Sequence, residues 1–267
     1  MLKQRVITAL VIAPIVLALV FFAPGWLFAL AMFAMALAGA WEWAALSGSP
    51  GLGSRVVTVL LFAAVAMAGG YLQSALPHPE AIMAYCWLAF CWWLVSLLWI
   101  AAWRGQFPLP IKILCGLLTL LPSLAAVVAV RAVSPWYLLI LLLLTTSADI
   151  GAYFAGRAYG KHKLAPLVSP GKTWEGVVGG IAAVTVMAAV ASHWLPVGPG
   201  PFILICIAAA LISVVGDLSE SLFKRQAGLK DSGTLFPGHG GVLDRVDSLT
   251  AAAPLYWLGL HWLGLLP

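Results

Sequence analysis

The dominant pattern in the sequence is a series of long apolar blocks separated by short segments rich in proline, glycine or charge. Each block is about 20 residues long, the length of helix that crosses a bilayer core about 30 Å thick. Unbroken blocks favour helices, because a membrane-spanning strand is about 10 residues long and alternates in polarity. The pattern predicts an all-α, polytopic membrane protein with about nine transmembrane helices, over residues 6–23, 26–46, 56–76, 81–102, 111–131, 136–158, 173–195, 201–223 and 248–266.

The composition agrees with a membrane protein and excludes a soluble fold. Of the 267 residues, 63% are hydrophobic and 9% are charged, whereas about 25% are charged in a typical soluble domain. No linker is long enough for a soluble domain, so residues 1–267 are predicted to form a single integral membrane domain. Residues 1–134 hold few ionisable groups, and we interpret them mainly as scaffold, lipid-facing surface or the interface of a homodimer. Residues 135–267 are expected to carry the active site.

The basic residues give an independent test of the number of spans. If the N-terminus is cytoplasmic and every predicted span crosses the membrane, all 14 basic residues except Arg131 lie in or beside cytoplasmic segments. This asymmetry is what the positive-inside rule describes, and a missed span would invert the later loops. We therefore expect a cytoplasmic N-terminus, a periplasmic C-terminus and an inner-membrane site that faces the cytoplasm. Because the net charge of +5 reflects topology signals, no nucleic-acid partner is expected.

The acidic residues are concentrated in the second half of the chain. A carboxylate within a membrane costs several kcal/mol unless it is paired, so an embedded one suggests a functional role. Glu42 is the one embedded carboxylate of the first five spans, and it lies in the half that we interpret as scaffold. The second half holds seven of the nine acidic residues: Asp149, Glu175, Asp217, Glu220, Asp231, Asp244 and Asp247.

The end of the eighth predicted span places polar side chains at helical spacing. Asp217, Glu220, Ser221 and Lys224 follow an i, i+3, i+4, i+7 pattern, which puts them on one face of a helix. Such a stripe can hold a metal ion and the phosphate that the ion bridges, or it can form a salt-bridged contact between helices. Near the end of the sixth span, glycines allow close helix packing, but packing does not explain Asp149.

The loop between the last two predicted spans combines glycines with carboxylates. Gly240 and Gly241 allow a backbone to approach a ligand closely and to expose its N–H groups. Asp244 and Asp247 are one helical turn apart, and their oxygens suit Mg²⁺ in the presence of phosphates. For His239 two roles stay open: a donor or acid–base group for a phosphate, or a structural hydrogen-bonding residue.

A second loop precedes the seventh predicted span. Ser169 is expected to cap that helix and Pro170 to occupy its first turn, and a helix N-terminus reinforced by Lys172 favours anions. The sequence Gly171-Lys172-Thr173 is similar to the end of a P-loop. We reject that interpretation because Pro166 stands where the first P-loop glycine belongs and no buried strand precedes it.

The motifs of the second half resemble a known enzyme family. The chain is similar to the bacterial phosphatidate cytidylyltransferases, also called CDP-diacylglycerol synthases, and the stretch from Asp149 to Gly176 resembles that family's upstream block. We see no departure from the family's signature, which is carried here by Ser221, Lys224, Arg225, Lys230, Asp231, Pro237, Gly238, His239, Gly240, Gly241, Asp244, Arg245 and Asp247.

The resemblance implies transfer of CMP from CTP to phosphatidate in phospholipid biosynthesis, with Mg²⁺ and room for a second cation. Asp217 and Asp244 match the metal-binding positions of the pattern. The expected catalytic residues are Asp217, Asp244, Lys224, Arg225, His239 and Asp247. The expected substrate-binding residues are Asp149, Ser169, Lys172, Thr173, Glu175, Lys230, Asp231, Gly240, Gly241 and Arg245.

Two other classes of membrane protein are alternatives to a cytidylyltransferase. A CDP-alcohol phosphotransferase would show D-G-x-x-A-R followed by spaced aspartates, and the sequence has no such pattern. An ion-coupled transporter would explain the embedded Asp149 and Asp217. Transporters commonly contain paired repeats with broken helices, whereas here polar residues crowd one half only. The sequence thus favours the enzyme.

Overall fold

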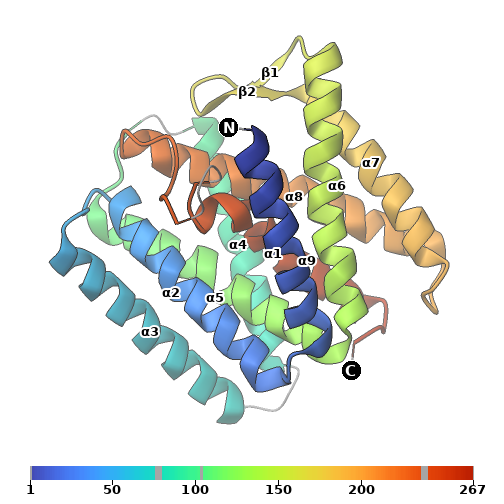
Figure 1. Cartoon of the computed structure of the whole chain (residues 1–267), viewed down its shortest axis with the longest axis horizontal. Coiled ribbons are helices and arrows are strands. Elements are labelled where there is room, and N and C mark those ends of the chain that lie inside the picture. The colour runs from blue at the N-terminus through green and yellow to red at the C-terminus, as the bar shows by residue number, and fades with distance from the viewer. Residues whose placement is uncertain (1, 76–79, 103–104, 236–239, 267) are drawn as a thin grey trace.

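The computed structural model describes residues 2–75, 80–102, 105–235 and 240–266, and within these ranges it is a bundle of nine α-helices with one small antiparallel sheet (Figure 1). In chain order the elements are α1 (Leu2–Phe22), α2 (Gly25–Leu46), α3 (Leu52–Ala75), α4 (Glu80–Ala102), α5 (Leu109–Val133), α6 (Pro135–Tyr159), β1 (Lys163–Ala165), β2 (Ser169–Thr173), α7 (Trp174–Ser192), α8 (Pro199–Gln226) and α9 (Leu243–Trp262).

Each predicted span corresponds to one of these helices, so the predicted helical fold is confirmed. Among the described residues, α2 to α8 are long and apolar enough to cross a membrane, and α1 contributes a shorter apolar stretch, Leu10–Phe22. The last helix, α9, carries Asp244, Arg245 and Asp247 in its first turns, which lowers its hydropathy. The protein is therefore a multi-pass membrane protein.

The β1–β2 hairpin was not predicted. Lys163 pairs with Thr173 and Ala165 with Ser169, so the segment expected to begin a helix is extended instead. The predicted cap at Ser169 is wrong: α7 begins at Trp174, and the N-cap is Thr173, whose Oγ1 accepts a hydrogen bond from the Gly176 N–H at 3.1 Å. Pairing with β1 keeps the preceding residues out of the helix.

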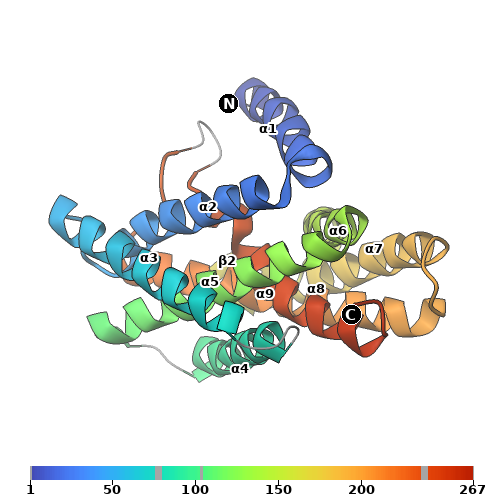
Figure 2. The ribbon, with the colours of Figure 1, turned by 90° about the horizontal axis from the view of Figure 1, so that it is seen from below.

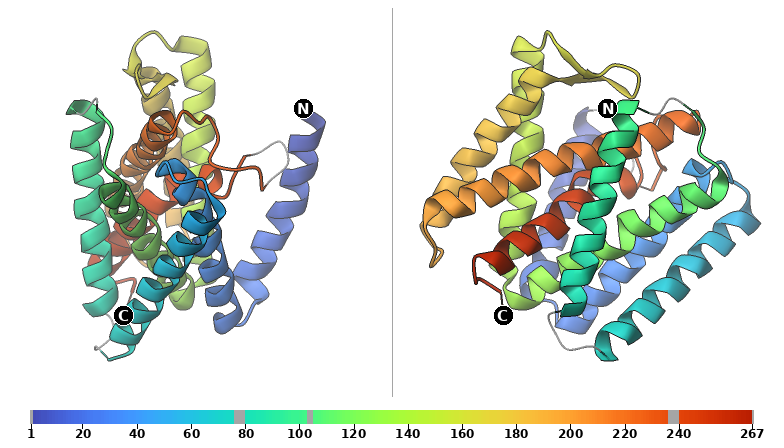
Figure 3. Two further views of the ribbon diagram at one scale, coloured as in Figure 1. Left: turned by 90° about the vertical axis from the view of Figure 1, so that its left-hand side faces the viewer. Right: turned by 180° about the vertical axis from the view of Figure 1, so that it is seen from behind.

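The hairpin joins α6 and α7, which lie side by side along one flank of the bundle (Figures 1 and 3). Their backbones approach closely: a Cβ atom added to Gly151 would lie 2.5 Å from the Gly179 carbonyl oxygen. The glycines of α6 thus serve helix packing, as predicted. The start of α1 and the hairpin lie toward one end of the molecule, and α9 ends toward the other (Figures 1 and 3).

The α8 and α9 helices pack on each other, and α4 packs against both of them. In the view of Figure 2, α1 stands at the periphery, where it contacts α6. The α8 and α9 helices cross tightly at Gly216, because a Cβ atom there would lie 2.5 Å from the Asp247 carbonyl oxygen. The buried Trp43 of α2 packs on Phe223 of α8 and donates from Nε1 to the Lys112 carbonyl oxygen at 2.7 Å. This crossing brings the polar ends of α8 and α9 together.

Candidate active site

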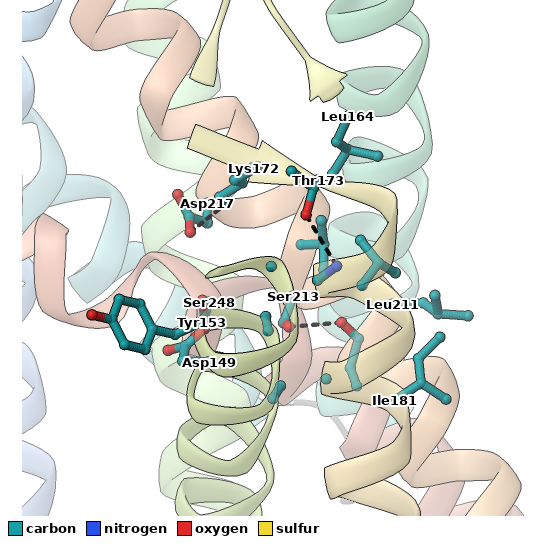
Figure 4. Close-up of a pocket in the computed structure, with 18 of the residues that line it drawn as sticks. Asp149, Tyr153, Leu164, Lys172, Thr173, Ile181, Leu211, Ser213, Asp217 and Ser248 are labelled. Atoms are coloured by element: carbon teal, nitrogen blue, oxygen red, sulfur yellow. Dashed lines mark hydrogen bonds and ion pairs between the residues drawn. The ribbon is translucent and has the colours of Figure 1, made fainter. Parts of the chain in front are cut away.

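A cavity of about 470 Å³ lies between α6, β2, α7 and α8 (Figure 4). Its polar lining includes Lys172 and Asp217, whose Nζ and Oδ2 atoms are 2.5 Å apart. Asp149 on α6 also lines it, close enough to Asp217 for the charged forms of the two carboxylates to repel each other. Figure 4 shows Leu211 and Ile181 away from the Lys172–Asp217 pair. The cavity is therefore amphipathic, with charged groups in one part and aliphatic side chains in another.

A buried ion-pair network lies where α8 meets the start of α9. The Lys224 Nζ atom is 2.7 Å from Asp244 Oδ1 and 3.1 Å from Glu220 Oε1. All three side chains are largely buried, and Glu220 is 5% exposed. A charge removed from water must be paired to be tolerated. The polar stripe predicted for the end of α8 is therefore present. Within it, Lys224 forms with Asp244 of α9 a salt-bridged contact between helices, which was the alternative to a ligand site.

The second oxygen of Asp244 is held by the loop before α9. Asp244 Oδ2 accepts hydrogen bonds from the Ser232 N–H, the Gly241 N–H and the Ser232 hydroxyl, each at 2.9 Å. Gly240 has a φ of +83°, and a Cβ atom on it would lie 2.5 Å from Asp244 Oδ2. Only glycine fits such a backbone at this separation without strain. The Gly241 N–H is thus directed to a carboxylate of the chain itself.

Sequence reasoning missed Glu42 and Ser232. Glu42 Oε1 accepts from the Val242 N–H at 2.9 Å, and Oε2 accepts from the Leu243 N–H at 3.0 Å and from the Ser232 hydroxyl at 2.8 Å. A residue of the half interpreted as scaffold therefore touches the site. Its embedded charge was the available signal, but the contact spans about 200 residues of sequence.

Other predicted residues lie around the cavity and the buried ion-pair network. Asp247 is half-buried and interacts electrostatically with Asp217. Thr173 lines the cavity in addition to capping α7. Arg225 is turned toward the hairpin, where its Nε donates to the Val168 carbonyl oxygen at 3.3 Å. Arg245 is exposed on the first turn of α9.

Some predicted substrate-binding residues are not brought to the cavity. Glu175 binds His162, with 2.7 Å between Glu175 Oε1 and His162 Nδ1, and thereby braces the hairpin against α7. Ser169 pairs within the hairpin. Lys230 and Asp231 are exposed. The predicted His239 lies outside the described residues.

The surroundings of each carboxylate indicate whether it could hold a metal ion. No cluster of three or more His, Cys, Asp or Glu side chains suited to a metal occurs among the described residues. Mg²⁺ commonly takes only one or two protein carboxylates and completes its shell with phosphate and water. Asp217 fits that role, since it is 27% exposed at the cavity and lies near two other carboxylates. Both oxygens of Asp217 have partners, Lys172 at Oδ2 and the Ser221 hydroxyl at Oδ1 at 3.4 Å, but the residue borders open space. Both oxygens of Asp244 also have partners, and that side chain is 9% exposed.

The fold and the site define a class: a multi-pass membrane protein with lysines and carboxylates gathered at one end of its helices, suited to handling phosphates. Comparison with known proteins agrees, because the sequence profile of the Cytidylyltransferase family matches residues 3–263. The chain belongs to this family, and the resemblance noted in its motifs is confirmed.

The relatives cover nearly the whole chain. A protein of Pseudomonas aeruginosa named phosphatidate cytidylyltransferase is 43% identical, over 96% of each chain. One of the same name from Haemophilus influenzae is 41% identical, over 96% of this chain and 97% of its own. A third, from Brucella melitensis, is 55% identical over 42% of each chain.

Proposed function

We propose that the protein transfers CMP from CTP to phosphatidate, giving CDP-diacylglycerol and pyrophosphate. The observation that carries the proposal is the amphipathic cavity, in which the Lys172–Asp217 pair lies beside aliphatic side chains. Two relatives that align with 96% of the chain bear the name of this activity. Residues 135–267 carry the chemistry, and residues 1–134 chiefly support it.

A lipid substrate suits the placement of the cavity in a membrane protein. Phosphatidate cannot leave the bilayer cheaply, because each CH₂ group contributes about 0.8 kcal/mol to membrane binding. CTP cannot enter the bilayer. The two substrates therefore have to meet at the interface. The cation of Lys172 suits the lipid phosphate, and Ile181 and Leu211 suit the apolar part of the molecule.

The reaction is a substitution at phosphorus. An oxygen of the phosphatidate phosphate bonds to the α-phosphorus of CTP, the bond from that phosphorus to the bridging oxygen breaks, and pyrophosphate leaves. A phosphate monoester is largely dianionic near neutrality, so no strong general base is needed. Positioning and charge neutralisation dominate such chemistry. Lys172, with the exposed Arg225, Lys230 and Arg245, supplies positive charge against the repulsion between the substrates, whereas the charge of Lys224 is offset by Asp244 and Glu220.

Mg²⁺ would neutralise phosphate charge in this site, and Asp217 is the residue best placed to hold it. Asp244, predicted from the motif as the second ligand, is paired with Lys224. Asp149 and Asp247 place two further carboxyl groups near Asp217, and a bound cation, or a second one, would stabilise their charged forms.

The site is proposed to face the cytoplasm from the inner membrane, with a cytoplasmic N-terminus and a periplasmic C-terminus. The distribution of basic residues supports this orientation. A reporter fused after Pro267 should be periplasmic, and one inserted after Gly228 should be cytoplasmic; both on one side would refute the topology. A homodimer through the first five helices stays a prediction for cross-linking in the membrane.

The function is tested with purified protein, phosphatidate and a choice of CTP, ATP or GTP, with CDP-diacylglycerol and pyrophosphate measured together. The proposal expects equal amounts of both products, preference for CTP, and loss of activity in excess chelator. Full activity in chelator would defeat the metal assignment. Equal use of ATP would defeat the assignment of the nucleotide.

A further inference from the structure

We propose that Glu42, on α2, is a positioning residue for the transfer reaction: it caps α9 from another helix and so holds Asp244 and Lys224 in place. The inference rests on the proposed function. It assigns to the first half of the chain a direct part in organising the site.

The start of α9 lacks a cap of its own. Its N-cap residue, Val242, offers no side-chain hydrogen bond to the first turn, although the first N–H groups of a helix have no partner within the helix. Glu42 supplies the acceptors, one oxygen to the Val242 N–H and the other to the Leu243 N–H. Its negative charge is also favourable at the positive end of the helix. This carboxylate therefore fixes where α9 begins.

The position of α9 sets the position of Asp244, the second residue of the helix. Ser232 links the two carboxylates, because its hydroxyl oxygen lies 2.8 Å from Glu42 Oε2 and 2.9 Å from Asp244 Oδ2. A hydroxyl has one proton and donates to one of them at a time. Asp244 in turn pairs with Lys224. A continuous set of polar contacts thus runs from α2 to the end of α8.

The loop is closely packed on Glu42. A Cβ atom on Gly233 would lie 2.5 Å from Glu42 Oε1, and one on Gly241 would overlap the same carboxylate. Glu42 is itself 6% exposed. No side chain larger than hydrogen fits at either glycine without moving the loop, so the glycines of this loop serve, at least at these two positions, to admit the carboxylate of α2.

The test is Glu42→Gln, which keeps the size of the side chain but places an NH₂ group against backbone N–H donors. We expect kcat to fall about tenfold or more, which corresponds to about 1.4 kcal/mol in the barrier. KM for phosphatidate should change little, so that the loss falls on kcat. Hydrogen exchange should accelerate at Val242 and Leu243. Glu42→Asp, which keeps the charge, should recover part of the rate.

Arg131→Gln is the matched control. Arg131 is another partly buried charge that binds backbone groups at a helix end, since its guanidinium donates to the carbonyl oxygens of Val20 and Ala23. The substitution should lower the melting temperature without lowering kcat at temperatures well below the transition. The inference is overturned if Glu42→Gln has wild-type kcat, or if both variants lose rate in the same way. An inactive wild-type protein would instead overturn the proposed function.

Discussion

Two lysine–aspartate pairs lie near the end of α8, and they differ in their access to solvent. The Lys172–Asp217 pair lines the cavity, and its side chains are 26% and 27% exposed. The Lys224–Asp244 pair is 11% and 9% exposed and is enclosed by Glu220, Ser232 and Gly241. A pair beside open space can exchange its partner for a substrate or a cation, whereas a buried pair whose carboxylate is also held by backbone N–H groups keeps its geometry. We therefore assign ligand binding mainly to the first pair and preorganisation mainly to the second.

The largest expected effect is on the buried pair. Asp244→Asn leaves the Lys224 charge with Glu220 alone, and breaking a buried pair typically costs about 3–5 kcal/mol. We expect a lowered melting temperature together with loss of turnover. Adding Lys224→Met should restore part of the stability but not the activity. Melting temperature and CDP-diacylglycerol formation, measured on the same preparations, distinguish these effects. If Asp244→Asn folds normally, is inactive and responds to added Mg²⁺, then Asp244 is a metal ligand as its motif predicts.

Asp217→Asn is expected to act on turnover alone. Asparagine keeps the size of the side chain and loses the charge that favours a hard cation. Turnover should fall about a hundredfold or more, equivalent to about 2.7 kcal/mol, with the melting temperature close to that of the wild type. A folded variant that retains more than about a tenth of the wild-type rate would remove Asp217 from the essential metal ligands.

The two pairs also show which features of the site could be predicted from the sequence. The apolar blocks predicted every helix of the described residues, because the thickness of the bilayer sets the length of a spanning helix. No contact between distant residues is needed to recognise such a block. The spacing of Asp217, Glu220 and Lys224 predicted their shared face, because helical geometry is local. The partners of Lys172 and Lys224 are 45 and 20 residues away in sequence, and spacing alone could not tell a ligand site from an ion pair.

The hairpin and Glu42 were missed for related reasons. Ser169 and Thr173 are both suitable N-cap residues, and only the pairing with Lys163 and Ala165 decides which one begins the helix. Glu42 was visible as an embedded carboxylate, but its partners are contributed by a loop and a helix far along the chain.

Lys172→Ala tests the open pair from its basic side. Loss of a cation that meets the substrate phosphate should lower kcat/KM for phosphatidate about tenfold, or about 1.4 kcal/mol, mainly through KM. Stability should change little, since partly exposed ion pairs contribute about 0–1 kcal/mol. An unchanged KM with a lowered melting temperature would show that the pair is structural.

The smallest effect is expected at Glu175, which the sequence placed among the substrate-binding residues. Its carboxylate binds His162, the residue directly before β1. Glu175→Gln should therefore reduce kcat/KM for phosphatidate less than Lys172→Ala does, under identical assay conditions. A larger reduction would return Glu175 to the substrate site and would weaken the distinction between cavity and hairpin.

In the proposed reaction, the α-phosphorus of CTP is transferred to a lipid in the cavity. Supplying the purified protein with phosphatidate, Mg²⁺ and CTP labelled either at the α- or at the γ-phosphate tests it most directly. We expect the α-label to enter the lipid fraction and the γ-label to be released as pyrophosphate, in equal amounts. Transfer of γ-label to lipid, or absence of α-label from lipid with an intact, folded protein, would contradict it.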